Sequence, residues 1–235
     1  MQRNLLPECV VIAFAVLQLP IGAAGHTVTF RGDDGRTIVG SLFEANRRPS
    51  AAVVLVPMLG RPRDDWQNIG EELANASITA LAVDLPGQRS PGNAGDLAGW
   101  HTVITGALSF LAARPDVRPS AMGVAGASLG ASLAVLAAAT DGRIRSLALV
   151  SPSLDYRGVR IDTALRQYGS RPALLMASLR DSYAARSVRE LAAGGPGPRE
   201  IQWSETAAHG SILLAREPDL SRSLVEWFRR TLGVN

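Results

Sequence analysis

The chain has 235 residues, of which 46% are hydrophobic and 19% charged, a balance typical of one globular domain with a sizeable core. The formal net charge is +3 and the basic residues are scattered, which argues against nucleic-acid binding. All 24 basic residues are arginine, so the chain has no lysine for a Schiff base, a pyridoxal phosphate site or a P-loop. A single cysteine, Cys9, excludes a disulfide framework, and three widely separated histidines argue against a metal site. We expect neither a cofactor nor a metal.

The first 25 residues differ in composition from the rest. One early basic residue, Arg3, precedes an apolar run at 10–19, and small residues follow up to Gly25. A short basic start, an apolar core and a small-residue end are the layout of a secretory signal peptide. The apolar run is shorter than the roughly 20 residues that span a bilayer, so a transmembrane helix is not expected. The sequence therefore predicts an exported protein, periplasmic or secreted, with a mature domain at 26–235 and no stable membrane insertion after cleavage. Two alternatives stay open: residues 1–25 are a core segment, or they are retained as a membrane tether.

From residue 26 onward, apolar runs of strand length alternate with stretches of helical period. Strands are expected at 28–31, 37–44, 51–56, 78–83, 121–125, 144–150, 173–177 and 200–203, the first two as a hairpin. Helices are expected from a cap at Asp64 or Asp65, from Asp96 to Leu111, after the fifth strand, within 155–168, at 182–193 and from Pro218. This alternation predicts an α/β fold with a mostly parallel eight-stranded sheet and helices on both faces. Ligands of such sheets bind at the carboxyl ends of the strands.

The residues around Ser128 match the pattern G-x-S-x-G, with Gly126 and Gly130 on either side. An apolar strand precedes the pattern and a helix follows it, which is the setting of a nucleophile elbow. Side chains two positions from the serine would clash in so sharp a turn, so glycine is needed there. The serine hydroxyl then lies over a helix N-terminus, where the dipole and free N–H groups favour negative charge. Because a glycine-rich chain matches this pattern easily, the interpretation depends on the rest of the site.

Two residues after later strands complete a candidate catalytic triad with Ser128. Asp181 follows the strand at 173–177, and His209 follows the strand at 200–203, so both belong at the same sheet edge as the serine. A serine hydroxyl needs a base to become nucleophilic, and His209 would be that base and later the acid. Asp181 would hold the tautomer of the histidine and stabilise the imidazolium. The order nucleophile, acid, base is that of α/β-hydrolases.

Alternatives to these assignments remain at this stage. Asp155 follows the preceding strand and is a rival for the acid, whereas Asp181 would then only cap a helix. The alternative for His209 is a loop histidine without a catalytic role. The other two histidines are poorer candidates for the base, because His26 lies at the expected cleavage site and His101 lies among helical residues before the elbow.

Several segments of the chain resemble the α/β-hydrolase superfamily in its small, core-only form, similar to dienelactone-hydrolase-like esterases. The resemblance extends from about residue 26 to the end and is carried by VLVPMLGRPRDDW, VDLPGQRS, VAGASLGAS, LMASLRDSYAARS and AAHGSILL. It implies the α/β-hydrolase fold with a minimal lid or none, and a structural, turn-forming role for Asp84. Dienelactone hydrolases use a cysteine nucleophile, so the serine at position 128 favours ester hydrolysis over that lactone.

An oxyanion hole needs two preorganised N–H donors. One is expected from Leu129, directly after the nucleophile. The other is expected from the loop after 51–56, where many relatives have His-Gly and this chain has Pro57-Met58. Proline has no N–H, so Leu59 is the first candidate and Met58 the second.

Two arginines, Arg61 and Arg63, follow this loop closely. A guanidinium fork at this place would receive a substrate carboxylate. The alternative is that both arginines pair on the surface with neighbours such as Asp64 and Asp65.

Together these features predict a cofactor-independent serine hydrolase acting on a small-molecule substrate. It would cleave a carboxylic ester, or a thioester or lactone, through an acyl-enzyme on Ser128. Peptidases and acyltransferases use the same triad. The alternative from another class is a catalytically degenerate binding module of this fold, which only Pro57 favours.

Overall fold

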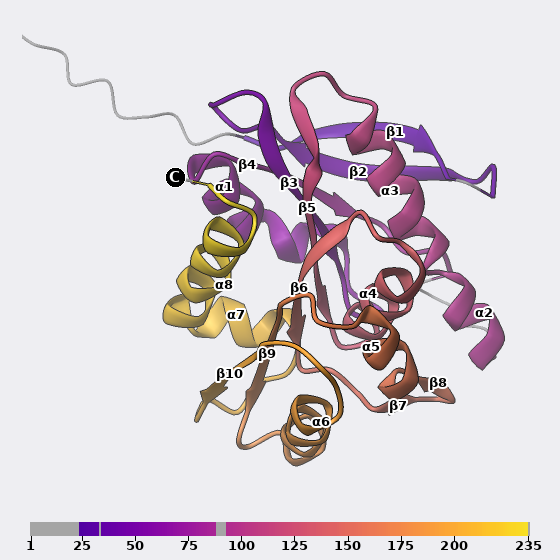
Figure 1. The fold of residues 1–235 in the computed structure, drawn as a ribbon, viewed down its shortest axis with the longest axis vertical. Helices are drawn as coiled ribbons and strands as arrows, with labels where there is room; N and C mark the ends of the chain where they lie inside the picture. Colours follow the sequence, from indigo (N-terminus) through magenta and orange to yellow (C-terminus); the bar gives the residue numbers. More distant parts are fainter. Residues whose placement is uncertain (1–23, 33, 88–92, 235) are drawn as a thin grey trace, which may run out of the picture.

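An eight-stranded sheet forms the centre of the protein in the computed structural model, which describes residues 24–32, 34–87 and 93–234 (Figure 1). Its strands are β1 (His26–Arg31), β2 (Thr37–Phe43), β3 (Ser50–Val56), β4 (Ile78–Val83), β5 (Val117–Ala127), β6 (Ile144–Val150), β9 (Ala173–Ser178) and β10 (Arg199–Ser204). They lie in the order β1–β2–β4–β3–β5–β6–β9–β10. Only β1–β2 and β2–β4 are antiparallel, so the predicted mostly parallel sheet is confirmed.

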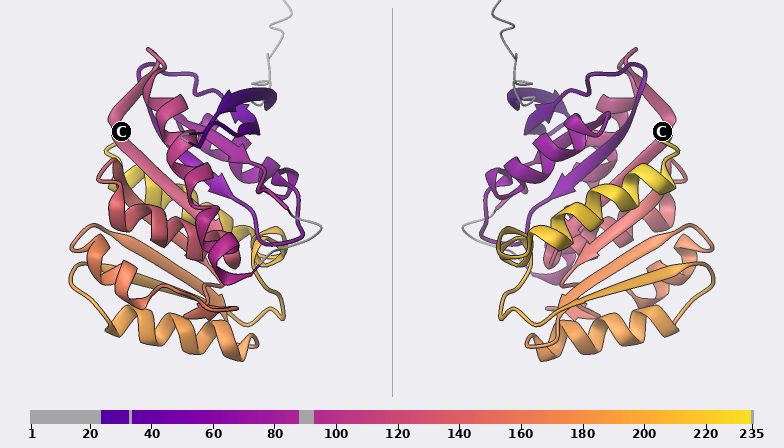
Figure 2. Two further views of the ribbon diagram at one scale, coloured as in Figure 1. Left: turned by 90° about the vertical axis from the view of Figure 1, so that its right-hand side faces the viewer. Right: turned by 90° about the vertical axis from the view of Figure 1, so that its left-hand side faces the viewer.

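Helices cover both faces of this sheet, as predicted (Figures 1 and 2). They are the 3₁₀ helix η1 (Arg63–Trp66), α1 (Gln67–Asn75), α2 (Ala94–Gly99), α3 (Thr102–Ala112), α4 (Leu129–Thr140), α5 (Asp162–Tyr168), α6 (Ser182–Ala193), α7 (Ser211–Arg216) and α8 (Pro218–Thr231). Helices α1, α7 and α8 pack on one face, and α3, α4, α5 and α6 on the other. Within the described ranges, none of the helices is both long and apolar enough to cross a bilayer.

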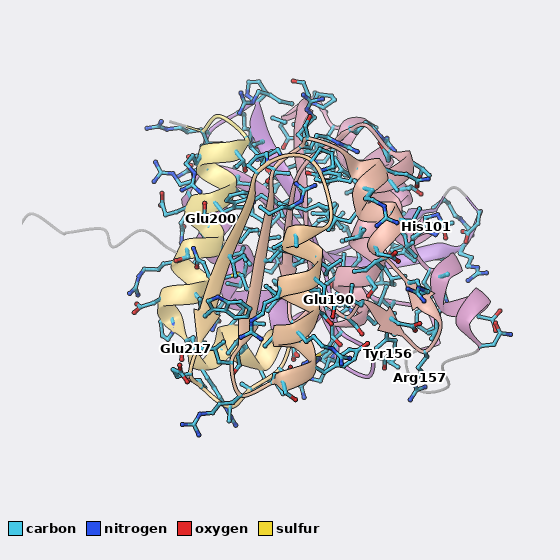
Figure 3. The ribbon with its side chains drawn as sticks, turned by 60° about the horizontal axis from the view of Figure 1, so that its bottom comes forward. His101, Tyr156, Arg157, Glu190, Glu200 and Glu217 are labelled. Carbon is cyan, nitrogen blue, oxygen red and sulfur yellow. The ribbon has the colours of Figure 1, made fainter. Side chains whose placement is uncertain are left out.

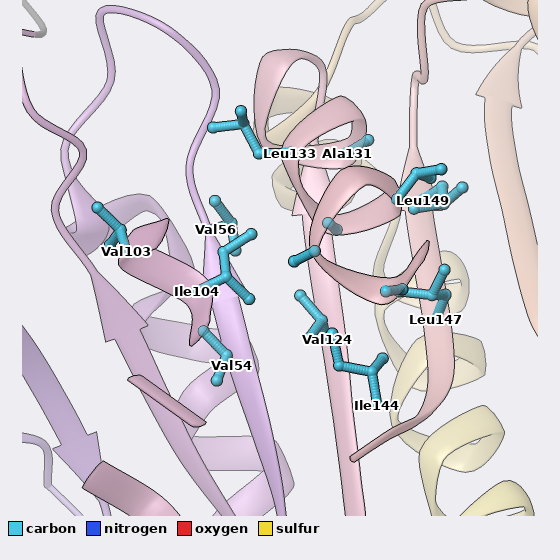
Figure 4. Packing of buried hydrophobic residues seen from close by; sticks show 14 of the residues in the cluster. Val54, Val56, Val103, Ile104, Val124, Ala131, Leu133, Ile144, Leu147 and Leu149 are labelled. Atoms are coloured by element: carbon cyan, nitrogen blue, oxygen red, sulfur yellow. The ribbon is translucent and has the colours of Figure 1, made fainter. Parts of the chain in front are cut away.

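The alternation of side chains along β3 explains why the core has two halves. Ala52, Val54 and Val56 belong to the cluster that contains α3 and α4, whereas Val53 and Leu55 belong to the cluster with α1 and α8. Figure 4 shows Val54 and Val56 beside α3. Every residue of β3 is buried, since a parallel strand covered on both faces has no side chain in water.

The predicted helix from Asp96 to Leu111 is wrong, because the chain forms two helices there. Asn93 caps α2 through a capping box with Asp96, and α2 ends at Gly99. The Nδ1 of His101 lies 2.8 Å from the carbonyl of Ala98, and the Thr102 hydroxyl donates to the carbonyl of Gly99. Side chains that compete for backbone carbonyls interrupt a helix, while the apolar spacing continues through the break.

The predicted cap at Asp64 or Asp65 is also wrong. The chain enters α1 through the 3₁₀ turn η1, and neither η1 nor α1 has a side-chain cap. Asp64 is exposed, and the carboxylate of Asp65 accepts hydrogen bonds from Arg61 and Ser211 instead.

Between β6 and β9, the described chain holds a small hairpin of β7 (Asp155–Tyr156) and β8 (Val159–Arg160), followed by α5. Neither this hairpin nor α7 is anticipated from the sequence pattern. The predicted signal segment, 1–25, lies almost wholly outside the described residues, which begin at 24.

Candidate active site

Ser128 lies in the sharp turn between β5 and α4, where it is the residue before the first helical position. Its φ of 51° and ψ of −114° are values that L residues rarely adopt, and its N–H donates to the carbonyl of Val150 at 2.9 Å. A Cβ added to Gly126 would lie 2.2 Å from the carbonyl oxygen of Gly130, and one added to Gly130 would lie 2.4 Å from that of Val56. Both glycines are therefore sterically required, as the motif predicts.

The side chains of Asp181 and His209 meet at the sheet edge where β5 ends. The Nδ1 of His209 lies 2.5 Å from the Oδ2 of Asp181. The other carboxylate oxygen accepts the N–H of Ala184 at 3.2 Å and so caps α6. The aspartate is thus a helix cap and a histidine partner at once, and the two interpretations do not compete.

The rival acid, Asp155, does not contact the histidine. Its Oδ1 accepts the N–H of Gly158 at 2.7 Å within the β7–β8 hairpin, whose Tyr156 and Arg157 are labelled in Figure 3. Tyr183 in the first turn of α6 donates its hydroxyl to the Asp155 carbonyl at 2.8 Å, so this hairpin borders the end of α6 that carries Asp181.

The contact with Asp181 leaves the Nε2 of His209 free to exchange a proton. Ser128 and His209 are not hydrogen-bonded to each other in this structure, and such catalytic bonds often tighten only when substrate binds. Their two loops do meet: a Cβ added to Gly210 would lie 2.5 Å from the Sδ of Met58 and 3.7 Å from the Cβ of Ala127. The backbone of Gly210, directly after the histidine, therefore lies close to Met58 and to Ala127, the residue before the serine.

Hydrogen bonds hold the loop that carries His209 at several points. Gly210 donates its N–H to the hydroxyl of Ser151 at 2.9 Å. Ser151 follows β6, is fully buried, and has a φ of 49°. At the start of the loop, Ser204 and Thr206 donate their hydroxyls to Glu217, which is labelled in Figure 3. The Thr206 and Ser204 hydrogen bonds lower the pKa of the Glu217 carboxyl below its usual value.

The expected oxyanion donors flank the elbow. Leu129 is the first residue of α4, a position whose N–H has no partner within the helix. On the other side, Gly130 packs directly against the backbone of Val56 and Pro57, which brings the loop after β3 to the elbow. In the described chain, neither Met58 nor Leu59 donates its N–H to a backbone carbonyl, so both candidates stay open.

Arg61 and Arg63 each face a carboxylate of the same chain. Arg61 donates two hydrogen bonds to the carboxylate of Asp65, from Nε at 2.7 Å and from Nη2 at 2.8 Å. Arg63 pairs with Asp84 and also donates from Nε to the Ser41 hydroxyl at 2.9 Å. These contacts favour the pairing alternative, although the partner of Arg63 is Asp84 rather than Asp64 or Asp65.

Asp84 itself is tied to Arg63 and donates its N–H to the carbonyl of Val39 at 3.0 Å, contacts that suit a structural residue. His26 lies in β1, at the far edge of the sheet order, and His101 lies between α2 and α3 (Figure 3). Neither of these histidines has a carboxylate partner among the described residues.

Sequence reasoning missed Ser151, Asp65 and Glu217 as supports of the histidine loop. Ser151 carries one signal, since it follows a buried strand as directly as Ser128 does. The sequence contains no such signal for Asp65 or Glu217. Ser211, the partner of Asp65, lies 146 positions away, and the partners of Glu217 lie at the end of β10 and in the loop after it, whose path the sequence pattern does not predict. Within the described ranges, no group of three or more histidine, cysteine or acidic side chains is placed to hold a metal ion.

The parallel sheet, the strained serine at the end of β5 and the acid–histidine pair after β9 and β10 define an α/β-hydrolase. The sequence matches the family model of serine aminopeptidase S33 over residues 47–193, which is more than half of the chain. The chain therefore belongs to this family. The matched segment includes Ser128 and Asp181 and ends before His209.

Longer proteins are among the curated relatives. The chain is 29% identical over 192 residues to a Mycobacterium tuberculosis (strain H37Rv) protein named as a candidate phosphoribosyl transferase, covering 77% of this chain and 41% of that protein. It is 36% identical over 138 residues to the polyketide transferase claH of Penicillium crustosum, covering 53% of this chain and 43% of that protein. The chain thus spans less than half the length of both.

Solved structures share the fold at low sequence identity. A dienelactone hydrolase from Anabaena variabilis aligns with a TM-score of 0.72 at 18% identity, covering 88% of this chain and 97% of that one. An acetyl xylan esterase from Paenibacillus sp. R4 aligns with a TM-score of 0.73 at 18% identity, covering 92% and 87%. At these identities the likeness concerns the fold.

Proposed function

We propose that the protein is a serine hydrolase that cleaves a carboxylic ester, thioester or lactone of a small molecule. The observation that carries the proposal is the 2.5 Å contact between Asp181 and His209 at the sheet edge where Ser128 occupies a strained turn. The solved dienelactone hydrolase and acetyl xylan esterase that share the fold support an ester-type substrate.

The mechanism proceeds through an acyl-enzyme. The Nε2 of His209 takes the proton of the Ser128 hydroxyl as its oxygen attacks the ester carbonyl, and Asp181 stabilises the imidazolium that forms. The N–H of Leu129, together with that of Leu59 or Met58, binds the oxyanion. His209 then protonates the leaving alcohol, and a water molecule activated by the same histidine releases the acid.

Labelling with a fluorophosphonate tests this proposal. We expect one adduct, located at Ser128 by mass spectrometry, and no adduct in the Ser128→Ala variant. The wild type should also hydrolyse p-nitrophenyl acetate faster than this variant. If the folded wild type neither reacts with the probe nor exceeds the variant in turnover, the binding-module alternative replaces the hydrolase.

Acyl transfer is a second candidate, because one curated relative is named a polyketide transferase. The same acyl-enzyme would then pass its acyl group to an alcohol or a thiol rather than to water. A series of added alcohols distinguishes the two reactions. Formation of the new ester in preference to the free acid, at alcohol concentrations far below that of water, identifies a transferase.

A further inference from the structure

Asp65, in η1, connects the loop after β3 with the helix that follows the histidine. Its side chain is 11% exposed, and Ser211, the first residue of α7, lies 146 positions away in the sequence. The Ser211 hydroxyl donates to the Oδ2 of Asp65 at 2.6 Å. Because Ser211 is two residues after His209, this bond anchors the histidine loop at its C-terminal end.

Three donors converge on the Asp65 carboxylate. Besides Ser211, the Nε and Nη2 groups of Arg61 donate to its two oxygens. Burial alone would raise the pKa of Asp65, but the hydrogen bonds from Arg61 and Ser211 outweigh it and lower the pKa below its usual value. An ionised carboxylate accepts at both oxygens and donates nothing, so only an ionised acid satisfies all three donors.

Arg61 in turn belongs to the loop that is expected to supply an oxyanion donor. Its N–H donates to the carbonyl of Met58 at 3.2 Å, closing the turn in which Gly60 has a φ of 75°. The side chain of Met58 lies against the backbone of Gly210. The loop after β3 and the histidine loop therefore contact each other directly at Met58 and are joined a second time through Asp65.

We infer that Asp65 is a positioning residue, which sets the place of His209 through Ser211 and the place of the oxyanion loop through Arg61. This inference rests on the proposed function. A shift of about 1 Å in a reacting group costs on the order of 100-fold in rate, so loss of this anchor should slow chemistry more than it weakens substrate binding.

The Asp65→Asn variant of the full chain tests the inference, with Asp64→Asn as the matched control. Asp64 is the neighbouring residue, is exposed and caps neither η1 nor α1 with its side chain, so its substitution makes the same change of charge without touching either loop. With p-nitrophenyl acetate, we expect kcat to fall about 10- to 100-fold in Asp65→Asn, KM to change less than about twofold, and Asp64→Asn to match the wild type.

Two further variants separate positioning from folding. Ser211→Ala keeps the pair of Arg61 and Asp65 and removes only the bond to α7, so it should lower kcat in a protein that melts near the wild-type temperature. The double variant Asp65→Asn/Ser211→Ala should be no slower than Asp65→Asn alone, because Ser211→Ala removes only the Ser211–Asp65 bond, which the substitution of Asp65 already disrupts. If Asp65→Asn does not fold, Ser211→Ala decides the question alone.

The proton resonance of the imidazole Nδ1–H gives a readout that needs no substrate. A short hydrogen bond to a carboxylate moves this resonance far downfield, and the His209→Ala variant assigns it. We expect the signal to be lost or shifted in Asp65→Asn and retained in Asp64→Asn. A wild type without turnover contradicts the proposed function, and the resonance still tests the positioning. A folded Asp65→Asn with an unchanged signal, or with wild-type kcat where turnover exists, overturns the inference.

Discussion

Asp181 contacts His209 and the first turn of α6 at the same time, with one carboxylate oxygen for each. Its Oδ2 lies 2.5 Å from the Nδ1 of His209, and its Oδ1 accepts the N–H of Ala184 at 3.2 Å. The hydrogen bond from the first turn of α6 therefore fixes the orientation of the carboxylate, with Oδ2 directed at the Nδ1 of His209. A group that is held in place before the reaction does not have to be reoriented during it.

Substitutions of Asp181 should separate these two roles. An asparagine at this position would still cap α6, but its amide cannot accept from Nδ1–H in the way a carboxylate does, so Asp181→Asn should lower kcat by about 10⁴-fold with little loss of stability. Asp181→Ala should lose the cap as well, which costs about 1 kcal/mol of unfolding free energy. Urea denaturation and steady-state kinetics of both variants measure the difference. Equal stability of the two variants would show that the cap contributes nothing.

Gly130→Ala should damage both the elbow and the loop after β3. The new Cβ would lie 2.4 Å from the carbonyl oxygen of Val56 and 2.6 Å from that of Pro57, and backbone atoms cannot move aside as a flexible side chain can. We expect about 1–3 kcal/mol of lost stability and about 100-fold lower kcat, because an oxyanion donor shifts. Gly142→Ala is the control, since its Cβ would meet nothing within 4 Å. Wild-type kinetics in Gly130→Ala would mean that this loop takes no part in the reaction.

Ser151→Ala should loosen the histidine loop from the side of β6. The N–H of Gly210 would lose its 2.9 Å acceptor in a buried place, at a cost of about 1–3 kcal/mol. We expect kcat to fall together with stability. Ser146→Ala is a matched control in β6, the strand that ends directly before Ser151, because the Ser146 hydroxyl bonds Thr231 and not the histidine loop. That variant should lose stability and keep its kcat; if the two variants behave alike, Ser151 has no positioning role.

Stability should fall on acidification because of carboxylates that the fold keeps ionised. The hydrogen bonds of Arg114 lower the pKa of Asp116, and those of Arg143 lower the pKa of Asp141 against the effect of its burial. A carboxyl group with a lowered folded-state pKa contributes stability above its unfolded pKa, near 3.9, and loses it as the pH falls through the folded value. We expect the unfolding free energy to hold down to about pH 5 and then to fall.

The Asp116→Asn variant provides the comparison for this pH dependence. It should be less stable than the wild type at pH 7, and its unfolding free energy should decline less between about pH 5 and pH 3, because one titrating group is gone. Urea denaturation at a series of pH values gives both quantities. A variant whose decline is as steep as that of the wild type would exclude Asp116 as a contributor.

Continuous apolar runs and helical spacing predicted the strands of the sheet and most of the helices, because burial on both faces of a parallel sheet leaves a direct mark on composition. The spacing failed at the break between α2 and α3, where the side chains of His101 and Thr102 bond backbone carbonyls without disturbing the apolar spacing. They also failed at Asp65, whose local pattern suits a helix cap as well as a tertiary contact.

The sequence by itself determined the class of fold and the elbow around Ser128, and it narrowed the candidate acid to Asp181 or Asp155 and the candidate base to His209, because these inferences depend on local patterns and chain order. Only the tertiary structure decided that Asp181 rather than Asp155 faces His209, and that Ser151, Asp65 and Glu217 hold the histidine loop. Those partners lie on different strands and helices. Which of them meet depends on how the elements pack, and no local pattern of residues records that.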